Sequence, residues 1–445
     1  MIFKAYDVRG LVPDELDVAA AVRIGAAFAR FAGGPEIIVG HDCRVSSPDL
    51  AAGLIEGITG QGVDVIHLGE ITTDMLYFAS GAYDRPGVVL TASHNPAAYN
   101  GMKFCLAGAA PVGRETGLAD IQATAEGPPP ARVVAGTVER RDARSGYVEH
   151  LFSIVDASHF ADLRVIADGG NGMAGVVLDR VFTRIPVELR GLYLEPDGTF
   201  PNHPADPLQP ENLTDLITLM EAERPDLGVA FDGDADRAFF VDDQLVPLPG
   251  SSTTAIVADW FLAREPGATI VHNLICSHAV PETVLARGGT PVRTRVGHSY
   301  IKQVMAETGA VFGGEHSGHY YFRDNFRADS GILTMLVLLQ VVSEAGVPLS
   351  ELRRAYELYT QSGEINFDVS DQQAALDTVT AAFADVEPDR LDGLTFDLGD
   401  QWFNLRPSNT EPKLRLNAEA DSPEAVAALV RRVGVLIERG TEEGT

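Results

Sequence analysis

Short apolar strands that end in small polar loops recur along this chain, and they constrain its fold more than any other feature. The clearest is the Val-Val-Leu run at 88–90, which is followed at once by Thr-Ala-Ser-His-Asn-Pro. An apolar β-branched run predicts a buried strand, and Asn-Pro predicts a turn. Segments expected to be helical separate such strands, for example at 16–32 and 47–60. This alternation predicts an α/β fold.

The length of 445 residues exceeds what one core can hold, so we expect several domains. Residues 1–143, 144–247 and 248–355 have similar sizes and a similar order of helices and strands, which predicts three related α/β domains with mixed sheets. From residue 356 to 445 the expected order changes to a strand, a helix at 372–384, several strands in succession and a final helix at 423–439. We therefore expect the last domain to be α+β.

The charge balance limits the partners of this chain. It carries 63 acidic and 34 basic residues, a net charge of −29. Such a chain repels nucleic acid and anionic membranes, so we expect neither as a partner. The sequence has no apolar stretch of bilayer length, no signal-like amino terminus and no paired cysteine spacing. We expect a cytoplasmic protein, a monomer or weak homo-oligomer, that captures any anionic substrate with a local cationic patch.

Ser93 lies where the 88–90 strand ends, with His94 beside it and Lys103 ten residues on. A serine hydroxyl is a poor nucleophile and needs help of this kind. Taken alone, the same residues also suit an ordinary strand-to-turn transition. Lysine is rare here, four against thirty arginines, and a retained lysine is a candidate for a charge whose pKa can be tuned.

A second loop, D-G-D-A-D-R at 232–237, follows another apolar strand. Asp232, Asp234 and Asp236 alternate along it, so three oxygen ligands can converge on one cation, and Mg²⁺ suits so few ligands better than Ca²⁺. An EF-hand is rejected because Arg237 stands where that loop needs glycine and because we expect strands on both sides. A solvated acidic turn remains the alternative.

Two further loops carry groups that suit a sugar phosphate. R-P-S-N-T-E-P at 406–412 offers a guanidinium, hydroxyls and an amide to a tetrahedral dianion, although a hairpin turn explains it too. In the loop 313–319, Glu315 and Ser317 can bind neighbouring sugar hydroxyls. Ligand sites gather at the carboxyl ends of strands in α/β sheets. Together the four loops predict phosphoryl transfer on a sugar phosphate.

The motifs T-A-S-H-N-P, D-G-D-A-D-R, G-E-H-S-G-H and R-P-S-N-T-E-P occur in this order over nearly the whole length, and the chain resembles the α-D-phosphohexomutase family. The opening A-Y-D-V-R-G also matches. The resemblance implies four domains around a central cleft, the last similar to the TATA-binding-protein fold. It is strongest to bacterial members that interconvert mannose 6-phosphate and mannose 1-phosphate, some of which also use glucose phosphates.

Substrate preference within that family stays open. His316 stands where bifunctional members often carry methionine and glucosamine-specific members often carry glutamine. Ala235 argues mildly against the glucosamine enzyme. Glucose and glucosamine phosphates therefore remain alternative substrates, and a metal-dependent sugar phosphatase or a non-catalytic sugar-phosphate sensor is a more distant alternative.

The resemblance also implies a mechanism and its residues. Ser93 would carry a phosphoryl group, and Mg²⁺ would be held by that group with the three aspartates. The phosphoryl would pass to the substrate to give a hexose 1,6-bisphosphate, which also serves as activator. Lys103 would be the general acid/base, with a pKa lowered by neighbouring cations. The implied catalytic residues are Ser93, His94, Lys103, Arg9 and Arg237. The implied substrate-binding residues are Tyr6, His298, Lys302, Glu315, Ser317, His319, Arg406, Ser408, Asn409 and Thr410.

Overall fold

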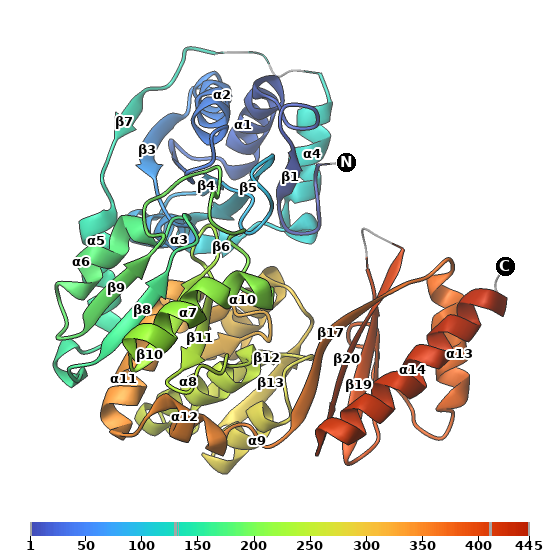
Figure 1. The fold of residues 1–445 in the computed structure, drawn as a ribbon. Helices are drawn as coiled ribbons and strands as arrows, with labels where there is room; N and C mark the ends of the chain where they lie inside the picture. Colours follow the sequence, from blue (N-terminus) through green and yellow to red (C-terminus); the bar gives the residue numbers. More distant parts are fainter. Residues whose placement is uncertain (1, 129–130, 132, 409–411, 444–445) are drawn as a thin grey trace.

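Four β-sheets, each formed by a different stretch of the chain, organise the molecule (Figure 1). The computed structural model describes residues 2–128, 131, 133–408 and 412–443. The first three sheets carry helices and pair strands both in parallel and antiparallel, whereas the fourth is antiparallel throughout. The prediction of three α/β units with mixed sheets and one α+β unit is confirmed.

The first sheet has the strand order β1-β5-β4-β2-β3-β7, with β6 beside β5. Its strands are β1 (Val8–Leu11), β2 (Glu36–His41), β3 (Asp64–Glu70), β4 (Gly87–Leu90), β5 (Tyr99–Leu106), β6 (Ala110–Pro111) and β7 (Val138–Arg140). Its helices are α1 (Val18–Ala32), α2 (Ser47–Thr59), α3 (Thr73–Tyr83) and α4 (Leu118–Glu126). All residues of β4 are buried, so the strand delivers the loop that follows it to a fixed place at the sheet edge.

The second sheet has the order β11-β10-β8-β9. Its unit contains α5 (Arg144–Ile154), β8 (Arg164–Asp168), α6 (Gly175–Phe182), β9 (Glu188–Leu192), α7 (Thr214–Glu223), β10 (Leu227–Phe231) and β11 (Ala238–Asp242). β10 and β11 form an antiparallel pair around the loop 232–237. Strands therefore flank this loop, which confirms the rejection of an EF-hand.

The third sheet has the order β13-β12-β14-β15-β16. Its strands are β12 (Thr269–Asn273), β13 (Thr290–Thr294), β14 (Phe312–Gly314), β15 (Tyr320–Phe322) and β16 (Ala328–Asp329). Its helices are α8 (Gly250–Arg264), α9 (Ala279–Ala286), α10 (His298–Thr308), α11 (Gly331–Ala345) and α12 (Leu349–Leu352). Helix α11 is apolar nearly all round and almost wholly buried, as expected for a helix at the centre of a core.

The fourth sheet has the order β17-β20-β19-β18. Its unit contains β17 (Thr360–Asp368), α13 (Gln372–Ala382), β18 (Leu394–Asp397), β19 (Gln401–Pro407), β20 (Lys413–Ala420) and α14 (Pro423–Glu443). Both helices lie on the outer side of this sheet, away from the rest of the molecule (Figure 1). The opposite face of the sheet is turned toward the other three units.

The hydrophobic cores separate the last unit from the others. One continuous cluster of buried side chains runs from the first unit through the second into the third, and it includes Tyr147 and Leu336. The last unit has a cluster of its own, built around Phe396, Phe403 and Val433. The first three units therefore pack as one block, to which the fourth is attached.

Helix and strand bounds agree with the sequence-based expectations to within a few residues. The sequence also predicts a strand at 269–276 and Ser47 as the cap of helix α2; the strand ends at Asn273 with a turn after it. Ser46 takes the cap position of α2 and forms no side-chain cap hydrogen bond. Within the described part of the chain no single helix is long and apolar enough to cross a bilayer; α11 with Leu349–Ala355 reaches that length only as a sharply bent pair.

Candidate functional site

The loop after β4 presents the Ser93 hydroxyl to the loop after β10. Ser93 Oγ donates to Asp232 Oδ2 at 2.7 Å and lies 3.3 Å from His94 Nδ1. The side chain is largely buried, with 3% of the residue exposed. Ser93 has φ = 50°, a left-handed conformation that a non-glycine residue rarely adopts. Such conformations persist where the surroundings hold them and are frequent at active sites.

Arg237 and His94 surround the same hydroxyl. Arg237 contacts Asp232 through Nε and Nη2, at 2.9 and 2.8 Å, and its Nη2 lies 3.4 Å from Ser93 Oγ. Nη2 also donates to His94 Nδ1 at 2.5 Å. Burial, together with the charges of Arg237 and Arg9, lowers the pKa of His94 to about 2. The imidazole is therefore neutral at physiological pH and accepts a hydrogen bond at Nδ1.

Arg9 reaches the loop from β1. Its Nε donates to Asp7 at 2.8 Å, and its Nη1 donates to Asn95 Oδ1 at 2.5 Å and to the Ala92 carbonyl at 3.3 Å. The predicted residues Arg9, His94 and Arg237 are thus all brought to the Ser93 loop, with His94 and Arg237 at the hydroxyl itself. The positive charges of the two arginines suit a site where a phosphoryl group is transferred.

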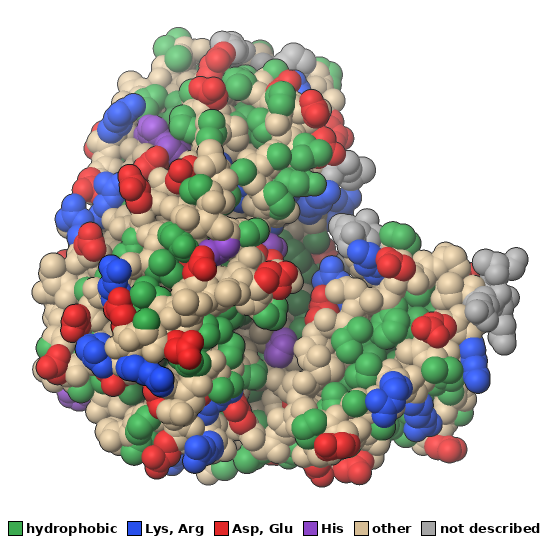
Figure 2. Space-filling view, viewed as in Figure 1, with side chains coloured by type: hydrophobic (Ala, Val, Ile, Leu, Met, Phe, Trp, Pro, Cys, Tyr) green, Lys and Arg blue, Asp and Glu red, His purple; other side chains and the backbone are tan. Residues whose placement is uncertain are grey.

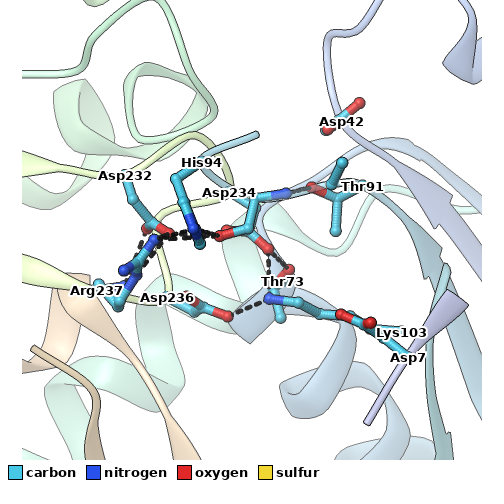
Figure 3. Close-up of polar contacts among 12 residues, drawn as sticks. Asp7, Asp42, Thr73, Thr91, His94, Lys103, Asp232, Asp234, Asp236 and Arg237 are labelled. Atoms are coloured by element: carbon cyan, nitrogen blue, oxygen red, sulfur yellow. Dashed lines mark hydrogen bonds and ion pairs between the residues drawn. The ribbon is translucent and has the colours of Figure 1, made fainter. Parts of the chain in front are cut away.

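The three aspartates of the loop 232–237 are fully buried, and their carboxylates converge (Figure 3). One oxygen of each lies within 4.8 Å of the others. Among the described residues, Asp234 Oδ1 and Asp236 Oδ1 have no hydrogen-bond partner although they are buried. Buried carboxylate oxygens without a partner lower the stability of the fold. Carboxylate oxygens in this arrangement can act as ligands of a divalent cation such as Mg²⁺. Burial, with the charges of Asp234 and Asp236, raises the pKa of Asp232 to about 7.

Lys103 on β5 lies between two of these carboxylates rather than among cations (Figure 3). Its Nζ donates to Asp234 Oδ2 at 2.7 Å and to Asp236 Oδ2 at 2.5 Å. Burial alone lowers the pKa of Lys103, but the charges of Asp234 and Asp236 outweigh it and hold the pKa above its ordinary value. The expected lowering is therefore wrong, because the sequence does not reveal how closely the carboxylates approach.

Glu315 is committed to internal hydrogen bonds. Only 2% of the residue is exposed, and its carboxylate accepts from Asn273 Nδ2 at 3.2 Å, from the Gly297 amide at 3.1 Å and from the Tyr321 hydroxyl at 2.8 Å. These contacts fix the loop that begins α10. Ser317 lies nearby, half-buried at the turn after β14.

His298 and Tyr6 form an aromatic contact at the base of α10. Their ring centroids are 5.1 Å apart, and the Tyr6 hydroxyl donates to the Val296 carbonyl at 3.1 Å. Burial and the charge of Lys302 hold the pKa of His298 well below its ordinary value. Both residues come from predicted positions and join the first unit to the third.

The structure places Lys302 inside the fold rather than in the cleft. Its Nζ lies 2.9 Å from Asp329 Oδ1 and 3.7 Å from the centre of the Tyr77 ring, and 2% of the residue is exposed. His319 also contacts Asp329, at 2.9 Å, and lies 3.7 Å from Asp236. No motif in the sequence predicts the ion pair between Lys302 and Asp329.

Arg406 faces the other end of the site, from β19. It contacts Asp392 at 3.5 Å and Glu364 at 3.4 Å, which are long distances for ion pairs. Ser408 follows it and is buried, while Asn409 and Thr410 lie outside the described residues. Arg415 on β20 stands directly opposite Arg406 across the antiparallel pair.

A cleft of about 640 Å³ lies between the last unit and the block, with Asp7 and Arg9 on one side and Arg406 and Ser408 on the other. Figure 2 shows this face hollowed between the two parts, with basic side chains at the rim. Six cationic and two anionic side chains line it: Lys4, Arg9, Arg295, Arg390, Arg406, Arg415, Asp7 and Asp392. In a chain with a net charge of −29, this is the local cationic patch that we expected for an anionic substrate.

Sequence reasoning missed two residues that hold the site together. Thr73, at the start of α3, donates to Asp234 Oδ2 at 2.6 Å, and Arg44, after β2, bonds to the Ser93 loop. Both follow strands of the first sheet, as Ser93 does. Their position at carboxyl ends of neighbouring strands was the available signal. The arginines at 295, 390 and 415 carried no motif.

Sequence-family profiles match all four units of the chain. Three are described as phosphoglucomutase/phosphomannomutase alpha/beta/alpha domains I, II and III and match residues 1–128, 145–245 and 249–359. The fourth is described as the phosphoglucomutase/phosphomannomutase C-terminal domain and matches residues 364–433.

Individual relatives match over nearly their whole length. Phosphohexose mutases of Xanthomonas campestris pv. campestris are 40% identical over 95% of this chain and 96% of theirs. A phosphomannomutase of Salmonella montevideo is 39% identical over 94% of each chain. The crystal structure of a phosphoglucomutase/phosphomannomutase family protein from Burkholderia thailandensis superposes with a TM-score of 0.89 at 33% identity, covering 99% of this chain and 96% of that one.

Proposed function

The chain belongs to the phosphoglucomutase/phosphomannomutase family, and we propose that it is an isomerase that interconverts mannose 6-phosphate and mannose 1-phosphate. The observation that carries the proposal is the Ser93 hydroxyl, buried between Arg237, His94 and Asp232 in a loop that Arg9 connects to a cationic cleft. Relatives named phosphomannomutase support mannose phosphates as the substrate. Glucose phosphates are a second substrate class, since other relatives carry the broader name phosphohexose mutases.

In this proposal Ser93 carries a phosphoryl group and gives it to a hydroxyl of the bound sugar phosphate. The Ser93 Oγ–P bond breaks as the sugar O–P bond forms; the sugar hydroxyl loses its proton and Ser93 Oγ gains one, so that the products are a hexose 1,6-bisphosphate and the free serine hydroxyl. The other phosphoryl group of this bisphosphate then returns to Ser93. Arg9, Arg237 and His94 stabilise the charge of the group in transfer, which is what phosphoryl transfer mainly requires.

Asp232, Asp234 and Asp236 would hold a Mg²⁺ ion beside that group. When bound, the ion supplies positive charge that neutralises the phosphoryl oxygens. Lys103 is within hydrogen-bond distance of two of these aspartates. Because its pKa is raised, it is protonated at rest and acts first as an acid or hydrogen-bond donor toward the oxygen that leaves.

The far end of the cleft would hold the phosphate that is not being transferred. Arg406, supported by Ser408 and the other cations of the cleft, can form charge-assisted hydrogen bonds with it. Glu315 and Ser317 of the third unit are the proposed sugar contacts, and Glu315 would exchange one of its internal hydrogen bonds for a sugar hydroxyl. Because both ends bind phosphate, the bisphosphate can present either of its groups to Ser93.

The proposal is tested by incubating purified protein with mannose 1-phosphate, Mg²⁺ and a catalytic amount of glucose 1,6-bisphosphate. We expect mannose 6-phosphate to form and Ser93 to be found phosphorylated by mass spectrometry. Parallel assays with glucose 1-phosphate and glucosamine 1-phosphate rank the substrates. Release of inorganic phosphate without an isomer, or no reaction at all, would contradict the proposal.

A further inference from the structure

We infer that Arg44 is the positioning residue of the Ser93 loop; the inference rests on the proposed function of Ser93. Arg44 follows β2 and belongs to none of the four loops that the sequence singled out. The residue is 0% exposed. Arginine is almost never fully buried unless it is paired, so its partners explain why it is there.

The guanidinium of Arg44 uses all five of its N–H donors. Four of them bond to backbone carbonyls between residues 93 and 99, and the fifth bonds to a carboxylate. The contacts are Nη2 to the carbonyls of Ser93 at 2.7 Å and Asn95 at 2.6 Å, Nη1 to those of Pro96 at 2.8 Å and Tyr99 at 3.0 Å, and Nε to Asp42 Oδ2 at 3.1 Å. Because guanidinium donors form a rigid fork, one side chain fixes four points of this backbone.

This loop needs an external partner for its carbonyls. With φ = 50° at Ser93 and turns at residues 93–94 and 97–98, its backbone does not continue a sheet before Tyr99. Several of its carbonyl groups point toward the buried guanidinium of Arg44. A buried carbonyl without a hydrogen-bond donor costs free energy of folding. Arg44 satisfies them together. The direction of Ser93 Oγ toward Asp232 follows from a backbone that Arg44 holds.

Arg44 is in turn held from two sides. Asp42 accepts from the Arg44 backbone amide at 3.0 Å and from Ser47 Oγ at 2.5 Å, which fixes the carboxylate. On the other side, the ring of Phe200 lies 5.0 Å from the guanidinium. Phe200 comes from the second unit, which also carries the three aspartates. Arg44 therefore links the nucleophile loop to the unit that bears its acidic partners.

The experiment compares Arg44→Lys with Arg353→Lys, a matched control. Arg353 is another buried arginine with carboxylate and carbonyl partners, but these are Asp242, Glu357 and the carbonyls of residues 246 and 247. Lysine has at most three donors, so the Ser93 loop loses contacts in the first variant only. We expect Arg44→Lys to lower kcat about 100-fold with KM changed less than about 3-fold, as a small misplacement of a reacting group does.

Hydrogen exchange of the peptide spanning 91–99 supplies a readout that does not depend on the reaction. We expect exchange to be faster in Arg44→Lys than in wild type and unchanged in Arg353→Lys. Absent isomerase activity in wild type would contradict the proposed function alone, because the exchange result still decides the role of Arg44. The role of Arg44 would be overturned if folded Arg44→Lys had unchanged kcat and exchange, or if kcat fell equally in Arg44→Lys and Arg353→Lys.

If Arg44→Lys fails to fold, Phe200→Leu replaces it, because this change removes only the ring beside the guanidinium. We then expect a smaller fall in kcat, about 3-fold by the same positioning argument, and faster exchange at 91–99. Unchanged kcat and exchange in that variant would overturn the inference.

Added guanidinium should restore part of the activity of a folded Arg44→Ala protein, whereas equimolar urea, which is planar but uncharged, should not.

Discussion

The two ends of the cleft hold their cations very differently. At the Ser93 end, Lys103 and Arg237 are buried and contact carboxylates at 2.5–2.9 Å. At the far end, Arg406 reaches its acidic neighbours only at 3.4–3.5 Å, and Arg415 stands opposite it with the same charge. Glu364 lies between these two arginines, 3.4 Å from Arg406 and 3.6 Å from Arg415, so one carboxylate faces two guanidinium groups. The cations at the Ser93 end are therefore closely paired with carboxylates, whereas those at the far end are paired only loosely and keep positive charge for an anionic ligand.

This difference matches the two tasks of the proposed reaction. The end that performs bond making has to be preorganised, since dipoles and charges that are fixed in advance cost nothing to reorient during the reaction. The end that anchors a phosphate has to accept either of the two phosphates of an intermediate that turns over. The hydrophobic cores follow the same division, with a continuous core behind Ser93 and a separate one behind Arg406.

Removing the nucleophile should have the largest effect. Ser93→Ala deletes the proposed phosphoryl carrier, and we expect kcat to fall by at least about 10⁴-fold, as for other nucleophile deletions. The measurement is conversion of mannose 1-phosphate, with binding of glucose 1,6-bisphosphate by calorimetry as the control. Near-normal turnover in this variant would place the chemistry elsewhere.

Changing the acidic loop should have the next largest effect. Asp234→Asn removes one charge from the proposed cation site, and we expect kcat to fall about 10²- to 10³-fold, a loss typical of transition-state electrostatics. In wild type, Mg²⁺ should raise the melting temperature by mass action. That rise should shrink in the variant. If the Mg²⁺-induced rise is the same in both proteins, the aspartates are not the cation site.

Weakening the far end should affect binding rather than chemistry. Arg406→Gln removes charge-assisted hydrogen bonds worth about 1.5–3 kcal/mol each, so we expect KM to rise about 10- to 100-fold. Because Arg406 is remote from the breaking bond, kcat should change much less. Steady-state kinetics over a range of mannose 1-phosphate concentrations measures both. A fall in kcat with constant KM would erase the contrast between the two ends.

Salt should produce the smallest effect and should act mainly on the open end. Raising ionic strength from 0.05 to 0.5 M should raise KM by about 2- to 5-fold, because exposed charges are screened and buried ones are not. The rise should be smaller in Arg406→Gln, which has already lost one cation of the cleft. A salt effect confined to kcat would locate the sensitive charges at Ser93 instead.

The sequence predicted the parts of this molecule that local pattern determines. The apolar runs before Ser93 and before Asp232 predicted strands. The site was predicted at the ends of these strands, because the carboxyl ends of parallel strands lie at one edge of a sheet. The antiparallel arrangement of the last unit followed from its successive strands β18, β19 and β20, which no helix separates.

Long-range charge pairing was beyond the sequence. The pKa of Lys103 was expected to fall among cations, whereas contacts with residues more than 130 positions away raise it. Lys302 was predicted to bind substrate, but in the structure it is buried against Asp329 and Tyr77. Arg44 carries no motif of its own, and only the folded loop shows that its five donors have five acceptors. Side-chain partners across domains cannot be read from spacing along one strand.

The separate core of the C-terminal unit makes it an exchangeable cassette. A graft that replaces the whole unit, residues 360–443, with the same unit of a relative would leave the shared core of the other three units untouched. Ser93 of such a chimera should still be phosphorylated, while the affinity for the opposite end of the sugar should be that of the relative from which the unit was taken. Substrate range in proteins of this architecture could therefore be engineered by module replacement, without any change near the nucleophile.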